Sequence, residues 1–427
     1  MLTRPFVVLW ISMLVAMAGI SMVSPLLPVH VQDDLHGPAI AVALSFSGLA
    51  VAQIIGSPFV GRLGDVFGTK RFIVIGFAIY ALGALGYVFA TTWEMVVFFR
   101  VFSGVGAAAV FPMSLAYIGR LAPPGAEGRY MGWFTVAQTG GFGIGPLIGG
   151  GLRDAFGAST AFSAMEVLLA GTALLTLIAL PSETAIVRPP PTTAVDAIPP
   201  RRRAPSADVI PYRVLLRNPA VVAATLLMLV IGAAWGVAAT WLAVFVIAPE
   251  GLGTNSALFA GLLLSVRQIV SATLQGFTGS LADRTSRVTL VAVGLIMSGI
   301  AQAAIPLVPR TLVETSILGP LMTMAPWVLV ALLIAGVGES LATPAQQAIF
   351  VEVGRHGGMG SLMGLNTMGN AIGFLSGSLL GALAKDLFGI EAVFSIAGAL
   401  TVGGTLVFVL LMTRVARPPE PAPAPSR

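Results

Sequence analysis

The sequence contains no cysteine, little histidine and few charged side chains. Of its 427 residues, none is Cys, 3 are His and 10% are charged, whereas soluble proteins carry about 25% charged residues. The absence of cysteine excludes disulfides, thiolate metal sites and cysteine nucleophiles. The sequence also shows no metal-binding cluster, nucleotide-binding loop or catalytic triad. We therefore expect neither an enzyme nor a metalloprotein.

Hydrophobic residues make up 56% of the chain, more than a soluble core of this size could bury. A lipid bilayer is the solvent that suits this composition, and apolar runs of about 20 residues recur along the whole sequence. The runs cover 6–29, 40–60, 72–90, 95–118, 130–151, 160–180, 219–247, 257–278, 288–306, 325–350, 361–383 and 391–413. The predicted fold is an all-α membrane protein with twelve spans, since backbone groups in lipid must be satisfied within their own segment.

Basic residues fall almost entirely on one side of the predicted spans. If the N-terminus is cytoplasmic, 18 basic residues lie in inside loops and tails, and only Arg153, Arg310 and Lys385 lie outside. The positive-inside rule then places both termini in the cytoplasm and the chain in the cytoplasmic (inner) membrane. The same distribution accounts for the net charge of +5 without a nucleic-acid partner.

One long polar connection, 182–218, divides the chain. It is rich in proline and arginine, a composition typical of a semi-rigid linker. We expect one six-helix bundle over 1–181, a second over 219–413, and a disordered cytoplasmic tail over 414–427. The run Arg201–Arg203 either sets the topology or contacts anionic lipid.

The two predicted bundles are related in sequence. A shift of 232 residues places Gly104-Val105-Gly106 on Gly336-Val337-Gly338, and a shift of 218 places Asp65 on Asp283. Two six-helix repeats of like orientation, with a substrate site between them, are typical of transporters.

A loop motif occurs once in each bundle. Gly61-Arg62-Leu63-Gly64-Asp65-Val66-Phe67-Gly68-Thr69-Lys70-Arg71 resembles the loop between helices 2 and 3 of the major facilitator superfamily, with Val66 where the family usually has Arg, and Gly279-Ser280-Leu281-Ala282-Asp283-Arg284 repeats it between helices 8 and 9. The resemblance implies a two-bundle carrier that works by alternating access. Its candidate gating residues are Gly61, Asp65, Gly68, Lys70, Arg71, Gly279, Asp283 and Arg284. Either aspartate could cap a helix N-terminus and pair with Lys70, Arg71 or Arg287.

The predicted fifth span carries a second motif. The stretch 141–150, GFGIGPLIGG, resembles the motif that marks the 12-span drug:proton antiporters of this family. Gly141, Gly145 and Gly149 share one helix face that favours close packing, and Pro146 removes a backbone hydrogen bond. The resemblance implies no cofactor and a proton gradient as the driving force. Many of these antiporters have a carboxylate in the first helix, but 6–28 holds no charged residue.

Four ionisable residues are predicted inside the membrane, where a charge costs about 3 kcal/mol or more. Arg267 and Glu339 fall at similar depth, so we expect them to pair if their helices are neighbours. Such a pair is either structural or a protonatable carboxylate whose partner changes between states. Glu166, in the sixth span, either satisfies Arg100 or faces the outer mouth.

Further candidates for the substrate pathway are polar or aromatic side chains that could equally well pack helices together. They are Gln138, Trp235, Gln346, Asn366 and Asn370. Two functions remain open: proton-driven export of amphipathic small molecules or drugs, and transport of lipid-like or organic-anion substrates. In either case the expected partners are the substrate and membrane lipids, and the chain is expected to act as a monomer.

Overall fold

The computed structural model describes residues 3–31, 35–182, 212–247, 251–253, 257–309, 313–315 and 322–415. The long helices of the first half are α1 (Arg4–Val29), α2 (Ala39–Phe67), α3 (Thr69–Phe89), α4 (Trp93–Leu121), α5 (Glu127–Phe156) and α6 (Ala158–Ala179). Those of the second half are α8 (Pro219–Ile247), α9 (Ala257–Ala282), α10 (Arg287–Ala304), α11 (Pro326–Gly357), α12 (Met359–Phe388) and α13 (Ile390–Val415). Residues 183–211 of the predicted linker 182–218 and residues 416–427 of the predicted tail 414–427 lie outside the described residues.

Three short elements were not predicted. Helix α7 (Tyr212–Leu215) precedes α8, and strands β1 (Val313–Thr315) and β2 (Met322–Met324) pair antiparallel between α10 and α11, with Val313 opposite Met324. The twelve long helices otherwise match the twelve predicted spans. The predicted all-α fold of two like six-helix bundles is therefore confirmed.

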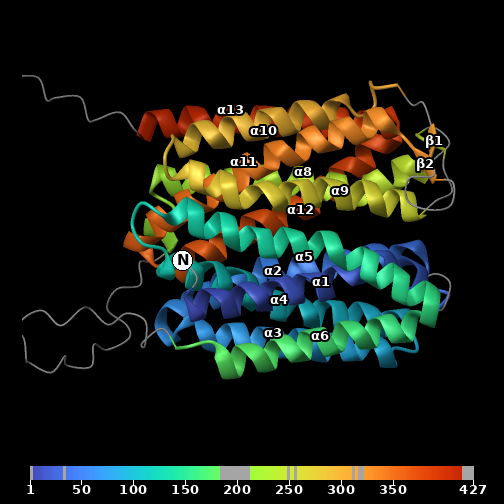
Figure 1. Cartoon of the computed structure of the whole chain (residues 1–427), viewed down its shortest axis with the longest axis horizontal. Coiled ribbons are helices and arrows are strands. Elements are labelled where there is room, and N and C mark those ends of the chain that lie inside the picture. Colours follow the sequence, from blue (N-terminus) through green and yellow to red (C-terminus); the bar gives the residue numbers. More distant parts are fainter. Residues whose placement is uncertain are drawn as a thin grey trace, which may run out of the picture.

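The two halves lie side by side and meet along two helix pairs. Figure 1 shows α3 and α6 along one edge of the molecule and α10 and α13 along the opposite edge. Between them, α2 of the first half packs along α12 of the second, and α5 packs along α9. These four helices therefore form the interface across which the halves can move.

Hydropathy follows this arrangement. Among the described residues, ten helices are long and apolar enough to span a membrane, and α5 and α9 are not among them. Of those ten, α2 and α12 have the lowest mean hydropathy. Helices that face a neighbouring helix rather than lipid tails need less apolar surface, so the least apolar helices lie where the halves meet.

Glycines of α5 and α12 bring the two halves into close contact in equivalent ways. Near its start, α5 carries Gly128, where a Cβ would lie 2.5 Å from the carbonyl oxygen of Gly279 on α9. The equivalent Gly360 of α12 abuts the carbonyl of Gly61 on α2. Small residues let helix backbones approach this closely. The closest approaches between the halves therefore lie near the starts of α5 and α12.

Many arginines gather at this end of the helices, which we call the basic end. They are Arg62, Arg120, Arg129, Arg284, Arg287 and Arg355. The start of α1 lies at the left in Figure 1, on the same side as this end, and the β1–β2 pair lies at the opposite end. The basic end is thus where charge and close helix contact coincide.

Candidate functional site

Asp65 joins the two halves at the basic end. Its carboxylate, two residues before the end of α2, accepts hydrogen bonds from the backbone N–H groups of Gly360 (2.6 Å) and Ser361 (2.7 Å). These belong to the first turn of α12, where N–H groups have no partner within the helix and favour negative charge. The Ser361 hydroxyl donates a further bond of 2.7 Å. The predicted capping role is thus present, and the capped helix belongs to the other half.

The predicted cation partners of Asp65 were wrong. Arg120 of α4 approaches Asp65 Oδ1 with its Nη2 at 2.7 Å. Lys70 instead donates to the carbonyl of Leu177 at the end of α6, 3.0 Å away, and Arg71 is exposed on α3. Because Lys70 and Arg71 follow the turn at Gly68 (φ 88°), they lie on the next helix, whereas α4 packs directly against α2.

Asp283 repeats this arrangement with the halves exchanged. It follows the end of α9, and its two oxygens accept from the backbone N–H groups of Gly128 (2.7 Å) and Arg129 (2.9 Å) at the start of α5. Arg287 Nη2 lies 3.8 Å from Asp283, as predicted. Arg284 is exposed.

Glu127 is the residue at the basic end that sequence reasoning missed. Its carboxylate lies 2.8 Å from Arg287 Nη2 and 3.0 Å from Arg355 Nη2, both in the second half. Arg287 also bonds Glu352 at 2.8 Å. Burial would raise the pKa of Glu127, but hydrogen bonds from its own backbone and from Arg287, with the charges of Arg287 and Arg355, hold that pKa below its ordinary value. The Gly125 backbone N–H also donates to Glu127 Oε2 at 3.0 Å. The sequence held one signal for this role: Glu127 is the only carboxylate in the predicted inside loop that carries Arg120 and Arg129.

Arg267 and Glu339 form the predicted buried pair. Arg267 Nε donates to Glu339 Oε2 at 3.2 Å, and its Nη2 donates to Oε1. A Cβ at Gly336 of α11 would lie 2.7 Å from the Arg267 carbonyl oxygen, so α9 and α11 touch one turn from the pair. The Arg267 side chain is 6% exposed and that of Glu339 16%. A two-contact ion pair of this kind is strong where water is scarce.

Arg100 makes its described contacts within the first half. Its Nε donates to the carbonyl of Ser45 on α2 at 3.2 Å, and its guanidinium lies 5.4 Å from the ring centroid of Phe46. Glu166 is not its partner: within the described part of the chain, Glu166 forms no hydrogen bond or ion pair, and its helix α6 packs on α1, α3 and α5. The alternative that Glu166 satisfies Arg100 is therefore wrong.

The other predicted pathway residues are not gathered in one place. Trp235 of α8 bridges the halves, with ring centroids 5.0 Å from Phe142 of α5 and 5.7 Å from Phe374 of α12. Asn366 donates to Gln347 at 3.0 Å. Gln346 is buried, and its amide has no hydrogen-bond partner among the described residues.

Two further pathway candidates, Gln138 of α5 and Asn370 of α12, are half-buried. Among the described residues their side chains form no hydrogen bond, so both amides are free to contact a ligand. Their role in transport stays a prediction.

The glycines of the fifth-helix motif pack α5 on α1, within the first half. A Cβ at Gly145 would overlap Ser21 and the carbonyl of Ala18, and one at Gly149 would lie 2.8 Å from the carbonyl oxygen of Met22. Gly141 likewise abuts Leu14, and Pro146 lies inside the same helix. The predicted close packing is present, and it stiffens one half rather than joining the two.

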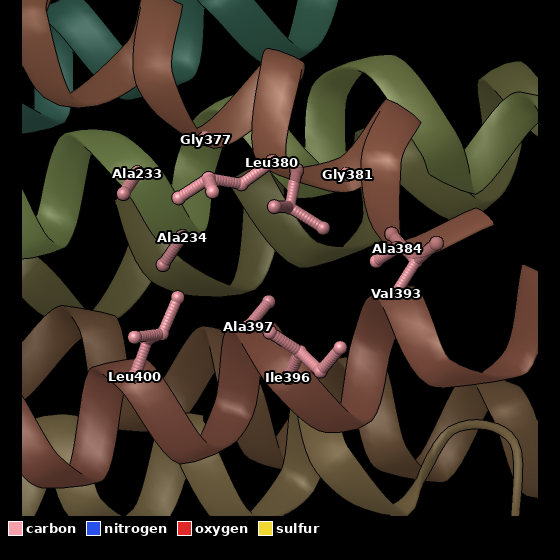
Figure 2. Close-up of a pocket in the computed structure, with 11 residues that line it drawn as sticks. Ala233, Ala234, Gly377, Leu380, Gly381, Ala384, Val393, Ile396, Ala397 and Leu400 are labelled. Atoms are coloured by element: carbon pink, nitrogen blue, oxygen red, sulfur yellow. The ribbon is translucent and has the colours of Figure 1, made fainter. Parts of the chain in front are cut away.

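A small cavity lies between α8, α12 and α13 (Figure 2). It is lined by Ala, Gly, Val, Leu and Ile residues, among them Ala233, Gly377 and Ile396, and its volume is about 10 Å³. This is at the lower limit for a single water, which would also need polar partners. It is a packing gap inside the second half and not a substrate site.

Comparison with known proteins agrees with this architecture. The chain matches the family model described as Major Facilitator Superfamily over residues 9–313 and 248–427. It is 37% identical over 155 residues to an uncharacterized MFS-type transporter of Methanocaldococcus jannaschii (36% of this chain, 40% of that protein). It is 31% identical over 175 residues to Multidrug resistance protein 2 of Bacillus subtilis (40% and 43%). These matches span only about two fifths of those relatives.

Two matches cover nearly the whole chain. Multidrug resistance protein MdtG of Dickeya zeae is 26% identical over 405 residues, which is 93% of this chain and 91% of that protein. The crystal structure of the human organic anion transporter MFSD10 (TETRAN) has a TM-score of 0.76 at 17% identity and covers 95% of this chain and 99% of that one; it shows the shared fold. The chain is an integral membrane protein that belongs to the major facilitator superfamily of transporters.

Proposed function

We propose that the chain exports amphipathic small molecules from the cytoplasm in exchange for protons. The substrate binds between the two halves, which alternate between opening to the cytoplasm and to the outside. The asymmetry of 18 inside against 3 outside basic residues supports an inner-membrane location with both termini and the basic end in the cytoplasm. Relatives described as multidrug resistance proteins support drug-like substrates.

The observation that carries the proposal is the Arg267–Glu339 pair. A carboxylate inside a membrane bundle is expensive unless it is paired or protonated. Arginine stays charged at any working pH, so Glu339 is the member of the pair that can change charge. Protonation of Glu339 would break the pair, and deprotonation would restore it, which provides two states of the second half that a proton gradient can bias.

The basic end supplies the gate in this proposal. In the structure the halves are joined there by the helix caps of Asp65 and Asp283 and by the contacts of Glu127 with Arg287 and Arg355. Opening toward the cytoplasm requires all of these to separate. Each of these contacts is worth about 1–2 kcal/mol, because lost partners are partly replaced by water, so ligand and proton binding can shift the balance.

The test measures proton release when a cationic dye binds to the purified protein in detergent at weak buffering. We expect release from the wild type and none from Glu339→Gln, with Glu166→Gln behaving as the wild type. Release that persists in Glu339→Gln and disappears in Glu166→Gln would move the proton site to α6. No release from any variant would overturn proton-coupled export.

Transport of organic anions or lipid-like substrates is the second candidate, and Arg100 favours it. This guanidinium is buried, and no carboxylate of the described residues lies within 4.0 Å of it. A buried cation of this kind is suited to neutralising an anionic headgroup. Binding of lysolipids or organic anions that is lost in Arg100→Gln, without dye-induced proton release, would support this function over drug export.

A further inference from the structure

One hydrogen bond joins the halves away from the basic end. Among the described residues, Thr139 of α5 donates its hydroxyl hydrogen to the amide oxygen of Gln275 on α9 at 3.1 Å, and the other side-chain bonds between the halves lie at the basic end. The two helices are also in close contact beside this bond, because Gly132 abuts the carbonyl of Gln275. The Gln275 side chain is therefore held between the two halves, about two helical turns before the end of α9.

The other end of the Gln275 amide points along α9 toward the buried ion pair. Its Nε2 donates to the hydroxyl oxygen of Ser271 at 2.9 Å. Arg267, Ser271 and Gln275 follow one another at intervals of four residues and so share one face of the helix. All three are at least 95% buried. This face carries polar groups from Glu339, through Arg267, to the contact with α5.

Loss of the charge on Glu339 would change the hydrogen bonds along this face of α9. A protonated Glu339 no longer neutralises Arg267 and keeps mainly its carbonyl oxygen as an acceptor, so the guanidinium, still charged and buried, gains from a further acceptor. Ser271 offers the next hydroxyl oxygen on the same face. If Arg267 turns toward Ser271, the amide of Gln275 loses its fixed position, and the bond from Thr139 across the interface weakens.

Other charges do not replace Arg267 near Glu339. The helices packed on α11 are α4, α5, α8, α9, α10 and α12. Their described charged side chains are Glu94, Arg100, Arg120, Glu127, Arg129, Arg153, Arg267, Arg287, Lys385 and Asp386. Among these only Arg267 lies within 4.0 Å of the Glu339 carboxylate.

We propose that Gln275 is a positioning residue that couples the charge of Glu339 to the contact between the two halves. The coupling passes from Glu339 through Arg267, Ser271 and Gln275 to Thr139. It rests on the proposed function in one respect, that Glu339 gains and loses the proton. It adds the route by which that proton opens or closes the interface between α5 and α9.

The test uses the full chain, which has no cysteine and so accepts spin labels at chosen sites without other changes. Pro124→Cys and Thr285→Cys place labels on exposed positions of the two halves at the basic end. Distances between the labels are measured in lipid nanodiscs from about pH 5.5 to 8.5, on both sides of a neutral operating pH. The variants are Gln275→Leu, Gln275→Met and Thr139→Val. Thr135→Val is the control, because Thr135 lies one turn away and bonds the Gly132 carbonyl of its own helix.

In the wild type and in Thr135→Val we expect the ratio of open to closed distances to change roughly fivefold or more across this range, as for a typical coupling between sites. In the Gln275 variants and in Thr139→Val both distances should remain populated, but their ratio should change less than about twofold, within the range of an uncoupled site. Two Gln275 variants are used so that a folding defect in one does not decide the result. Gln275 variants that keep the wild-type pH response would overturn the coupling.

The Glu339→Gln variant in the same labelled protein separates the two proposals. If Glu339→Gln abolishes the pH response and the Gln275 variants keep it, the coupling route is wrong and the proton site stands. If Glu339→Gln keeps the pH response while the Gln275 variants lose it, the proton site is wrong and the Gln275 contact responds to another group. If the label distances in the wild type do not change with pH, both the proton site and the coupling route are wrong.

Discussion

Asp65 and Asp283, 218 residues apart in the chain, each cap the N-terminus of a helix that belongs to the other half. Asp65 of the first half caps α12 of the second, and Asp283 of the second half caps α5 of the first. The capped N–H groups belong to Gly360 and Ser361 in one case and to Gly128 and Arg129 in the other. The duplicated loop motif thus makes two reciprocal contacts, and both must break for the basic end to open.

Removing either charge should favour the open basic end. In Asp65→Asn or Asp283→Asn the amide oxygen can still accept a hydrogen bond, but the attraction to the helix N-terminus is lost. We expect each change to shift the balance toward the open state by about 1–2 kcal/mol, from capping and charged hydrogen-bond values. Distances between the labels at Pro124→Cys and Thr285→Cys measure this shift. Asp386→Asn, exposed near the end of α12 away from the basic end, should leave the distances unchanged.

Acid should loosen the same end through Glu127. Its pKa is lowered in the closed state from the ordinary 4.5, so closure binds fewer protons than opening. The stabilisation it provides is fully present above the ordinary pKa and is lost as pH falls through the lowered pKa. Open distances should therefore become more populated below about pH 4.5, the ordinary pKa.

The Glu127 measurement is made in a Glu339→Gln background, so that protonation of Glu339 cannot contribute to the change in label distances. Glu127→Gln should reduce the acid response and leave only the part that comes from Asp65 and Asp283, whereas Glu94→Gln, exposed at the start of α4, should preserve it in full. An acid response as large in Glu127→Gln as in Glu94→Gln would assign it wholly to other groups.

Two glycines of α5 can be compared directly: Gly145, inside the fifth-helix motif, and Gly151, the residue after it. In Gly145→Ala the new methyl group would overlap Ser21 and the Ala18 carbonyl, so α1 and α5 must move apart. Overpacking of this kind costs typically 1–3 kcal/mol, and we expect a lower unfolding temperature in detergent. At Gly151 nothing lies within 4 Å of an added Cβ, and Gly151→Ala should be neutral or slightly stabilising because alanine favours helix. Equal unfolding temperatures for the two variants would contradict the packing described.

The fold was predictable because its causes are local and repeated. Apolar runs fix the spans, and the motifs at Asp65 and Asp283 fix the repeat. The depth of Arg267 and Glu339 could be counted from the helix ends because a helix rises by a constant amount per residue. That count required only that α9 and α11 be neighbours, and they are.

Other contacts depend on which side chains the packed helices bring together. Arg120 reaches Asp65 because α4 packs on α2, although Lys70 and Arg71 are nearer in sequence. Glu127 reaches Arg287 and Arg355 across the interface, 160 residues away in the case of Arg287. Gln275 looks like an ordinary polar residue on a helix until its neighbour Thr139 is known. Such pairings are set by helix rotation, which spacing along the chain does not determine.

The Arg267–Glu339 pair should respond unequally to the loss of its two members. If Arg267 is replaced by Leu, Glu339 can take up a proton and become neutral, which limits the cost of its burial. If Glu339 is replaced by Leu, Arg267 stays charged and has no carboxylate partner, a situation that costs about 3–5 kcal/mol. We therefore expect Glu339→Leu to lower the unfolding temperature in detergent more than Arg267→Leu does. The double replacement should recover most of the loss, since an apolar pair of similar volume often packs as well as a buried ion pair. A double variant that is stable but releases no protons on dye binding would show that the ion pair is needed for transport and not for folding. A double variant as unstable as Glu339→Leu would instead show that the bundle depends on these charges to fold.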